Sequence, residues 1–85
     1  MEMKYYITYG IWKPGVSDSV EKVNKAVEDW SKHVKAAGME IVFWGSPLGV
    51  SEDAVFVYKG SPENYPKILT NTPYTNTRTN IVLKV

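Results

Sequence analysis

One stretch, residues 18–38, constrains the fold more than any other, because its apolar residues recur with the period of an α-helix. The recurring residues are Val20, Val23, Val27, Trp30, Val34 and Ala37. Steps of three and four residues place all of them on one stripe of a helix, and they do not fit a strand. Asp18 is the predicted N-cap, and Gly38 suits the left-handed position that follows a helix. A helix cannot bury such a stripe alone, so a sheet or other helices must cover it.

Four segments have the composition of β-strands, with one before the predicted helix and three after it. They are residues 4–12, 40–44, 54–58 and 77–85. The first is rich in aromatic and β-branched residues, and Gly10 within it indicates a bulge or a close approach by another group. The second and third are apolar on both faces, which indicates that both faces are covered. The loop between them, residues 45–53, is longer than a tight hairpin needs, and such loops often carry function.

A second helix is predicted after residue 60, with Ser61 as its N-cap and Pro62 at its first position. It should be short, because Pro66 interrupts it, and Ile68 and Leu69 are its expected anchors. The element order is then β-α-β-β-α-β, which is the ferredoxin-like arrangement. We expect one α+β domain over residues 1–85, with a four-stranded antiparallel sheet and both helices on one face. A three-stranded sheet with a disordered tail and an open α+β meander are the alternatives.

The composition excludes several kinds of site. The chain has no cysteine, which rules out disulfides and thiolate metal ligands, and its one histidine has no carboxylates at metal-binding spacing. We therefore expect no metal and no cofactor. Ten basic and nine acidic residues leave a net charge of +1, which gives no electrostatic footprint for nucleic acid or an anionic membrane. No apolar run is long enough for a membrane span, and the signal-peptide pattern is missing, so a cytoplasmic location is the expectation.

The second face of the predicted sheet is the main indication of a partner. Two helices cover one face, and the other should be polar if the chain is a monomer. Whichever register the strands take, that other face carries several apolar or aromatic residues from this set: Tyr6, Thr8, Trp12, Val42, Trp44, Phe56, Tyr58 and Val82. A patch of this size on a soluble protein usually marks an interface. We expect a homodimer in which two sheets stack face to face.

The pattern resembles that of the dimeric α+β barrel proteins, over the whole chain. The local likeness is to small archaeal-type members, through residues 9–15, 43–45, 49–53 and 73–79. Characterised members of this superfamily include haem-degrading and quinone-forming monooxygenases, muconolactone isomerase and chlorite dismutase. The resemblance implies a sheet-to-sheet dimer and a pocket between the sheet and the helices. It carries no function by itself.

Seven side chains are candidates for a site. His33 lies at the edge of the helical stripe, where it is either an acid–base group or a boundary residue packing its ring on Trp30. Trp12, Trp44 and Tyr58 are candidates for stacking on a flat ligand, and Trp30 and Tyr9 are candidates for lining a pocket, although such residues more often form a core or an interface. The guanidinium fork of Arg78 matches the geometry of a carboxylate, so Arg78 is a candidate for binding a substrate carboxylate. A surface salt bridge is an equally good explanation for an arginine at this position.

Two classes of function follow from these observations. The first is a non-catalytic module that binds a small apolar or aromatic ligand or joins subunits, which the scarcity of proton-transfer and metal-binding groups favours. The alternative is a small-molecule monooxygenase or isomerase with its pocket between the first helix and the sheet. The sequence leaves open whether the protein is an enzyme.

Overall fold

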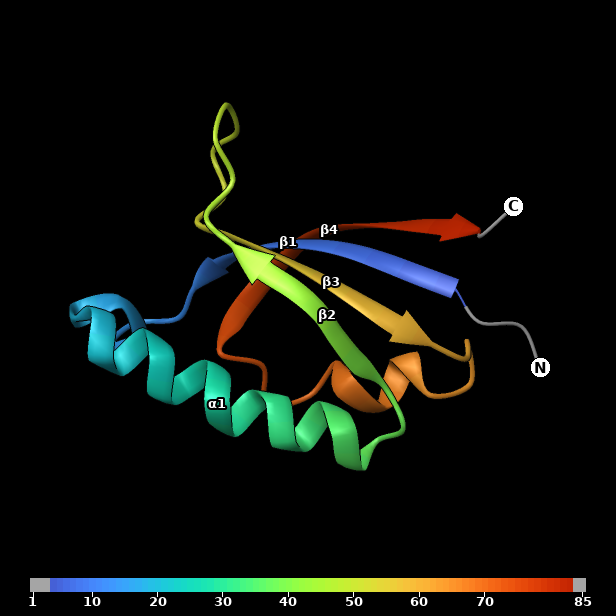
Figure 1. The fold of residues 1–85 in the computed structure, drawn as a ribbon. Coiled ribbons are helices and arrows are strands. Elements are labelled where there is room, and N and C mark those ends of the chain that lie inside the picture. Colours follow the sequence, from blue (N-terminus) through green and yellow to red (C-terminus); the bar gives the residue numbers. More distant parts are fainter. Residues whose placement is uncertain (1–3, 84–85) are drawn as a thin grey trace.

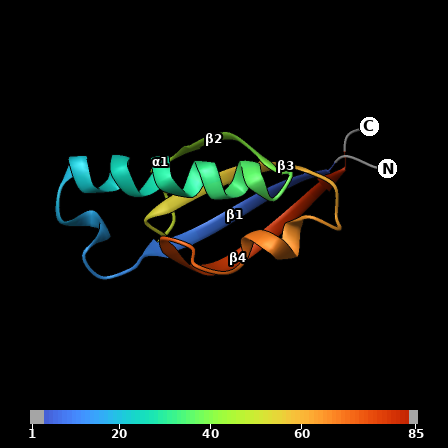
Figure 2. The ribbon, with the colours of Figure 1, turned by 90° about the horizontal axis from the view of Figure 1, so that it is seen from below.

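The computed structural model describes residues 4–83, which form one α-helix, two short 3₁₀ helices and a four-stranded sheet. The elements are β1 (Lys4–Trp12), η1 (Val16–Asp18), α1 (Val20–Ala36), β2 (Glu40–Gly45), β3 (Ala54–Gly60), η2 (Tyr65–Ile68) and β4 (Tyr74–Leu83). The sheet has the order β2-β3-β1-β4, and every pairing is antiparallel. Both α1 and η2 lie on the same side of it (Figures 1 and 2). The predicted α+β class and antiparallel sheet are confirmed.

The helix α1 matches its prediction in the interior and differs at its first turn. Val27, Trp30 and Val34 are buried against the sheet, whereas Val20 is 77% exposed. Ser19 rather than Asp18 is the N-cap, because its hydroxyl accepts a hydrogen bond from the Lys22 backbone N–H at 3.1 Å, while Asp18 belongs to η1. Gly38 has a φ of 84°, as predicted for the residue after a helix. No helix among residues 4–83 is long and apolar enough to cross a membrane.

Two predicted elements need correction. The second helix is the single 3₁₀ turn η2, because Pro66 at its start cannot donate a backbone hydrogen bond and the chain does not continue as an α-helix. Ile68 is buried as expected, but Leu69 is 49% exposed and is no anchor. Strand β4 begins at Tyr74, three residues before its predicted start at residue 77, because residues 74–76 pair with the end of β1. The last two residues of the predicted strand lie outside the described range.

The core lies between α1 and one face of the sheet. Tyr6, Thr8, Phe56 and Tyr58 point toward α1 and are buried. They alternate along β1 and β3 with residues on the opposite face, as side chains in a strand must. The buried cluster is completed by Trp30 and Val34 from α1 and by Ile68 and Tyr74 from the later part of the chain, among others.

Gly10 lies both at an irregularity of the strand pairing and close to another side chain, so both expectations for this position are confirmed. The pairing of β1 with β4 is irregular between Tyr9 and Gly10, and the ring of Tyr74 lies directly over the Gly10 Cα. A side chain at this position would collide with a buried ring that is held on its other side by Phe56, with a 5.0 Å separation of ring centroids.

We therefore expect Gly10→Ala to lower the free energy of unfolding by about 1–3 kcal/mol, the usual cost of overpacking a core. The matched control is Gly45→Ala in β2, since a Cβ on Gly45 would have no atom within 4 Å. Urea denaturation of the two variants measures the difference. Equal stabilities for Gly10→Ala and Gly45→Ala would contradict the packing described here.

Candidate functional site

The face of the sheet that points away from α1 is the first candidate surface. Within residues 4–83, no helix or strand lies over it (Figure 1). We call it the open face. Its residues, which alternate with the buried ones, are Tyr5, Ile7, Tyr9, Ile11, Phe43, Val55, Val57, Lys59, Arg78, Asn80 and Val82. Most of the residues predicted for this face, including Tyr6, Phe56 and Tyr58, lie on the α1 side instead.

The centre of the open face is apolar. Phe43, Val57 and Ile7 lie side by side across β2, β3 and β1 in the strand register. Phe43 is 58% exposed, whereas Val57 is only 8% exposed because its two neighbours flank it on the central strand. A bulge at Val42 separates Phe43 from Ile41 and so turns the Phe43 ring onto this face.

Polar groups lie at the two ends of the open face. At one end, Glu40 is the cross-strand partner of Lys59, whose Nζ lies 6.0 Å from the centroid of the Tyr5 ring. At the other end, the Arg78 guanidinium lies over the Tyr9 ring, with 4.2 Å from its Cζ to the ring centroid. Both ends therefore combine a cation with an aromatic ring.

The end that contains Arg78 also fixes the foot of the loop formed by residues 46–53. Arg78 Nε lies 3.4 Å from a Glu52 carboxylate oxygen, and the Thr77 hydroxyl donates to the same oxygen at 2.9 Å. Asp53 joins β1 twice: its backbone N–H donates to the Gly10 carbonyl at 3.0 Å, and its carboxylate accepts from the Trp12 N–H at 3.1 Å. The loop is thus anchored to the ends of β1 and β4.

On the α1 side, buried polar atoms satisfy one another. Trp30 Nε1 donates to the Tyr58 hydroxyl at 2.9 Å, and that hydroxyl shares a 2.6 Å hydrogen bond with the Tyr74 hydroxyl. Within the described residues, no buried side-chain nitrogen or oxygen lacks a hydrogen-bond partner. This part of the molecule is therefore a filled aromatic core, in which the rings already occupy one another's faces and edges.

The buried hydroxyls predict a loss of stability in alkali. Burial raises the pKa of Tyr58 from 10.0 to about 12, and it raises the pKa of Tyr74 as well. Because the folded state holds the Tyr58 proton more tightly than the unfolded state, the contribution of Tyr58 is complete below pH 10 and is lost as the pH rises from 10 to 12. Urea denaturation should show a fall on the order of 2–3 kcal/mol for Tyr58 over this range. Tyr58→Phe should show a shallower fall, and an equal fall in both proteins would contradict the assignment to Tyr58.

The predicted site residues divide between the two sides of the sheet. Tyr9 and Arg78 meet on the open face. Trp12 and Trp44 pack on Phe56 on the α1 side, with ring centroids 6.0 Å and 5.8 Å from it. Trp30 lies in the core and His33 stacks on its outer side, 5.1 Å between ring centroids. These residues therefore do not line a common pocket.

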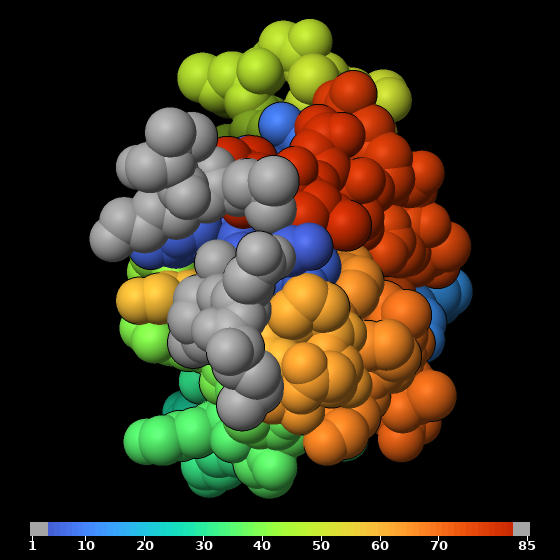
Figure 3. Space-filling view, turned by 90° about the vertical axis from the view of Figure 1, so that its right-hand side faces the viewer, coloured from blue at the N-terminus to red at the C-terminus, as the bar shows by residue number. Residues whose placement is uncertain are grey.

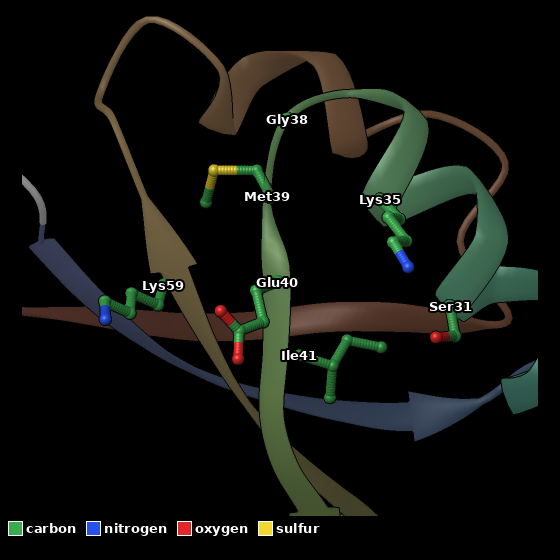
Figure 4. Close-up of a pocket in the computed structure, with 7 residues that line it drawn as sticks. All are labelled: Ser31, Lys35, Gly38, Met39, Glu40, Ile41 and Lys59. Carbon is green, nitrogen blue, oxygen red and sulfur yellow. The ribbon is translucent and has the colours of Figure 1, made fainter.

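Three depressions border α1, and the first of them is a wide, shallow hollow of about 680 Å³ between η1 and the first turns of the helix. His33 and Trp30 line a cavity of about 190 Å³ with Asp29 and Asn71, which is smaller than the roughly 300 Å³ of an ordinary ligand pocket. A larger open groove of about 500 Å³ runs between the end of α1 and β2. Figure 4 shows Ser31 and Lys35 on its helical wall and Glu40, Ile41 and Lys59 along the strands. Its lining mixes two amines with one carboxylate and includes none of the predicted ligand-binding residues.

Sequence reasoning missed two parts of this surface. The surface salt bridge expected as one explanation of Arg78 is present, but its partner Glu52, which also accepts a hydrogen bond from Thr77 25 positions away, has no local pattern that identifies it. The exposed Phe43 belongs to an apolar run whose bulge is invisible in the sequence.

Within residues 4–83, no three histidine or acidic side chains gather in a geometry that could hold a metal ion. Comparisons with protein-family models, with curated proteins and with solved structures found no match for the chain.

Proposed function

We propose that the protein is a homodimeric assembly module in which the open face of one copy packs against the open face of a second. The observation that carries the proposal is the apolar row of Phe43, Val57 and Ile7 on a sheet face that no described helix covers. An exposed apolar patch that is bordered by polar residues is the usual mark of an interface. Burial of the Phe43 ring alone would contribute about 1.5–3 kcal/mol per subunit.

The arrangement of charge on the open face supports a second copy as the partner. A two-fold dimer requires a surface that is complementary to itself. The open face has an apolar centre, and each of its ends carries both signs of charge, with Glu40 beside Lys59 and Glu52 beside Arg78. A second copy of the chain is therefore not repelled by a surface that carries only one sign of charge. An apolar centre within a polar border is also the usual anatomy of a protein interface.

The fold supports the same proposal. The strand order β2-β3-β1-β4, with α1 and η2 on one side, is compatible with the ferredoxin-like arrangement and with the sheet-to-sheet dimers of the α+β barrel proteins. The α1 side offers less support for ligand binding, because Trp30, Tyr58 and Tyr74 fill the space between helix and sheet and bond to one another. The assembly role is thus favoured over a pocket in that space.

Sedimentation equilibrium of the wild-type chain at micromolar concentration tests the proposal. The expected mass is twice the 9.6 kDa of one chain. A mass of one chain that does not increase with concentration over this range would overturn the proposal.

A further inference from the structure

The loop of residues 46–53 has a feature that the open face alone does not explain. Leu48 at its tip is 95% exposed, and Val50 is 39% exposed. The loop stands up from the sheet on the side opposite α1 (Figure 1), and it is foreshortened when the sheet is viewed from below (Figure 2). Figure 3 shows it from the side, rising above β4 at the top of the molecule. The loop therefore projects in the direction in which a stacked partner would lie.

The foot of the loop is held in place, so the exposed tip belongs to an ordered arm. Glu52 contacts Thr77 and Arg78 of β4, and Asp53 makes two hydrogen bonds to β1. The part beyond these anchors, residues 46–51, can rise by about three extended residues, which is roughly 10 Å. Stacked sheets are also about 10 Å apart. The tip consequently reaches the level of a partner's sheet.

The size of the open face gives a second reason for this arm. Four strands at about 4.8 Å spacing and seven paired residues at about 3.4 Å each give a face of roughly 450 Å². Each partner of a stable complex usually buries about 800 Å². Contacts beyond the face would add to the buried surface, and the apolar arm is continuous with the face.

We propose that residues 46–51 form an arm that packs Leu48 against the end of the partner's sheet in the homodimer. This inference rests on the proposed function. By two-fold symmetry both arms act together, so each dimer buries two Leu48 side chains. The arm lengthens the contact at both ends of the stacked faces and accounts for a leucine that would otherwise stand in water.

The first test compares Leu48→Ser with Leu69→Ser. Leu69 is an exposed leucine as well, at 49%, but it follows η2 on the α1 side. Sedimentation velocity over a concentration series should show the dimer dissociation constant of Leu48→Ser raised roughly 100-fold, because two leucine contacts are lost per dimer. Leu69→Ser should match the wild type. A dimeric Leu48→Ser with an unchanged constant would overturn the arm while leaving the proposed function intact, whereas a monomeric wild type would overturn both.

The second test uses the absence of cysteine from the chain. Leu48→Cys carrying a benzophenone label has a single attachment point, and irradiation should join two chains. Mass spectrometry should place the cross-link on residues at an end of the partner's sheet. Cross-links to α1 of the partner, or products within one chain alone, would overturn the inference.

Discussion

Trp30→Ala should lower the free energy of unfolding by about 3–5 kcal/mol, the usual cost of removing a buried tryptophan. Trp30 fills the space between α1 and the sheet, where its ring contacts the edge of Tyr74 and stacks on His33. Its removal also takes away the N–H that bonds to the Tyr58 hydroxyl at 2.9 Å. The whole free energy of unfolding of a small domain is about 5–15 kcal/mol, so the variant should unfold at a much lower urea concentration.

The matched control for this substitution is Val20→Ala. Both residues belong to the same predicted helical stripe, but Val20 is 77% exposed, so its truncation should change stability by less than about 0.5 kcal/mol. Tyr58→Phe removes the hydroxyl and its hydrogen bonds but keeps the ring, and it should lower the free energy of unfolding by about 1–3 kcal/mol. Similar losses for Trp30→Ala and Val20→Ala would contradict the placement of Trp30 in the core.

The helix and the first residues of β1, β2 and β3 could be predicted because they depend on local periodicity. Val27, Trp30 and Val34 follow the helical stripe into the core, and β1 runs over the predicted residues 4–12. Pro66 correctly indicated that the second helix would be poor, and its missing N–H explains why only a 3₁₀ turn forms. The first turn of α1 was less predictable, since Asp18 and Ser19 are both good caps and the preceding η1 turn decides between them.

The choice of face could not be made from the sequence. Both sides of β1 read as apolar and aromatic, so the alternation alone does not say which side meets the helix. The structure shows that Thr8 and Gly10, the small residues, lie on the helix side. Their size leaves room for Tyr65 and Tyr74, which approach from more than 50 residues away. Such long-range packing has no local signature, and the candidate site residues were divided between the two faces for the same reason.

Phe43→Lys should raise the dimer dissociation constant at least about 100-fold. Two phenylalanine rings leave the interface per dimer, each worth about 1.5–3 kcal/mol, and two ammonium groups must be buried or pushed apart. Phe43 is 58% exposed in the single chain, so its replacement should leave the fold of the monomer intact. Val57→Lys, at the centre of the same row, would be a harsher change because Val57 is buried within the monomer.

The control for Phe43→Lys is Leu69→Lys, which makes the same change of charge at a half-exposed apolar residue on the α1 side. Sedimentation velocity gives the dimer dissociation constant of each variant, and circular dichroism checks that both variants are folded. If Leu69→Lys weakens the dimer as much as Phe43→Lys does, the effect is one of net charge and the open face is not the interface.

An isotope-filtered NOE experiment tests the central claim most directly, because it reports contacts between copies and nothing else. Labelled and unlabelled chains are mixed and allowed to exchange, and NOEs are collected between the two kinds of chain. The open-face dimer predicts contacts from Ile7, Phe43 and Val57 of one copy to the same row of the other. Intermolecular contacts that arise from α1 instead, or a spectrum without intermolecular contacts at a concentration where the mass is that of one chain, would contradict it.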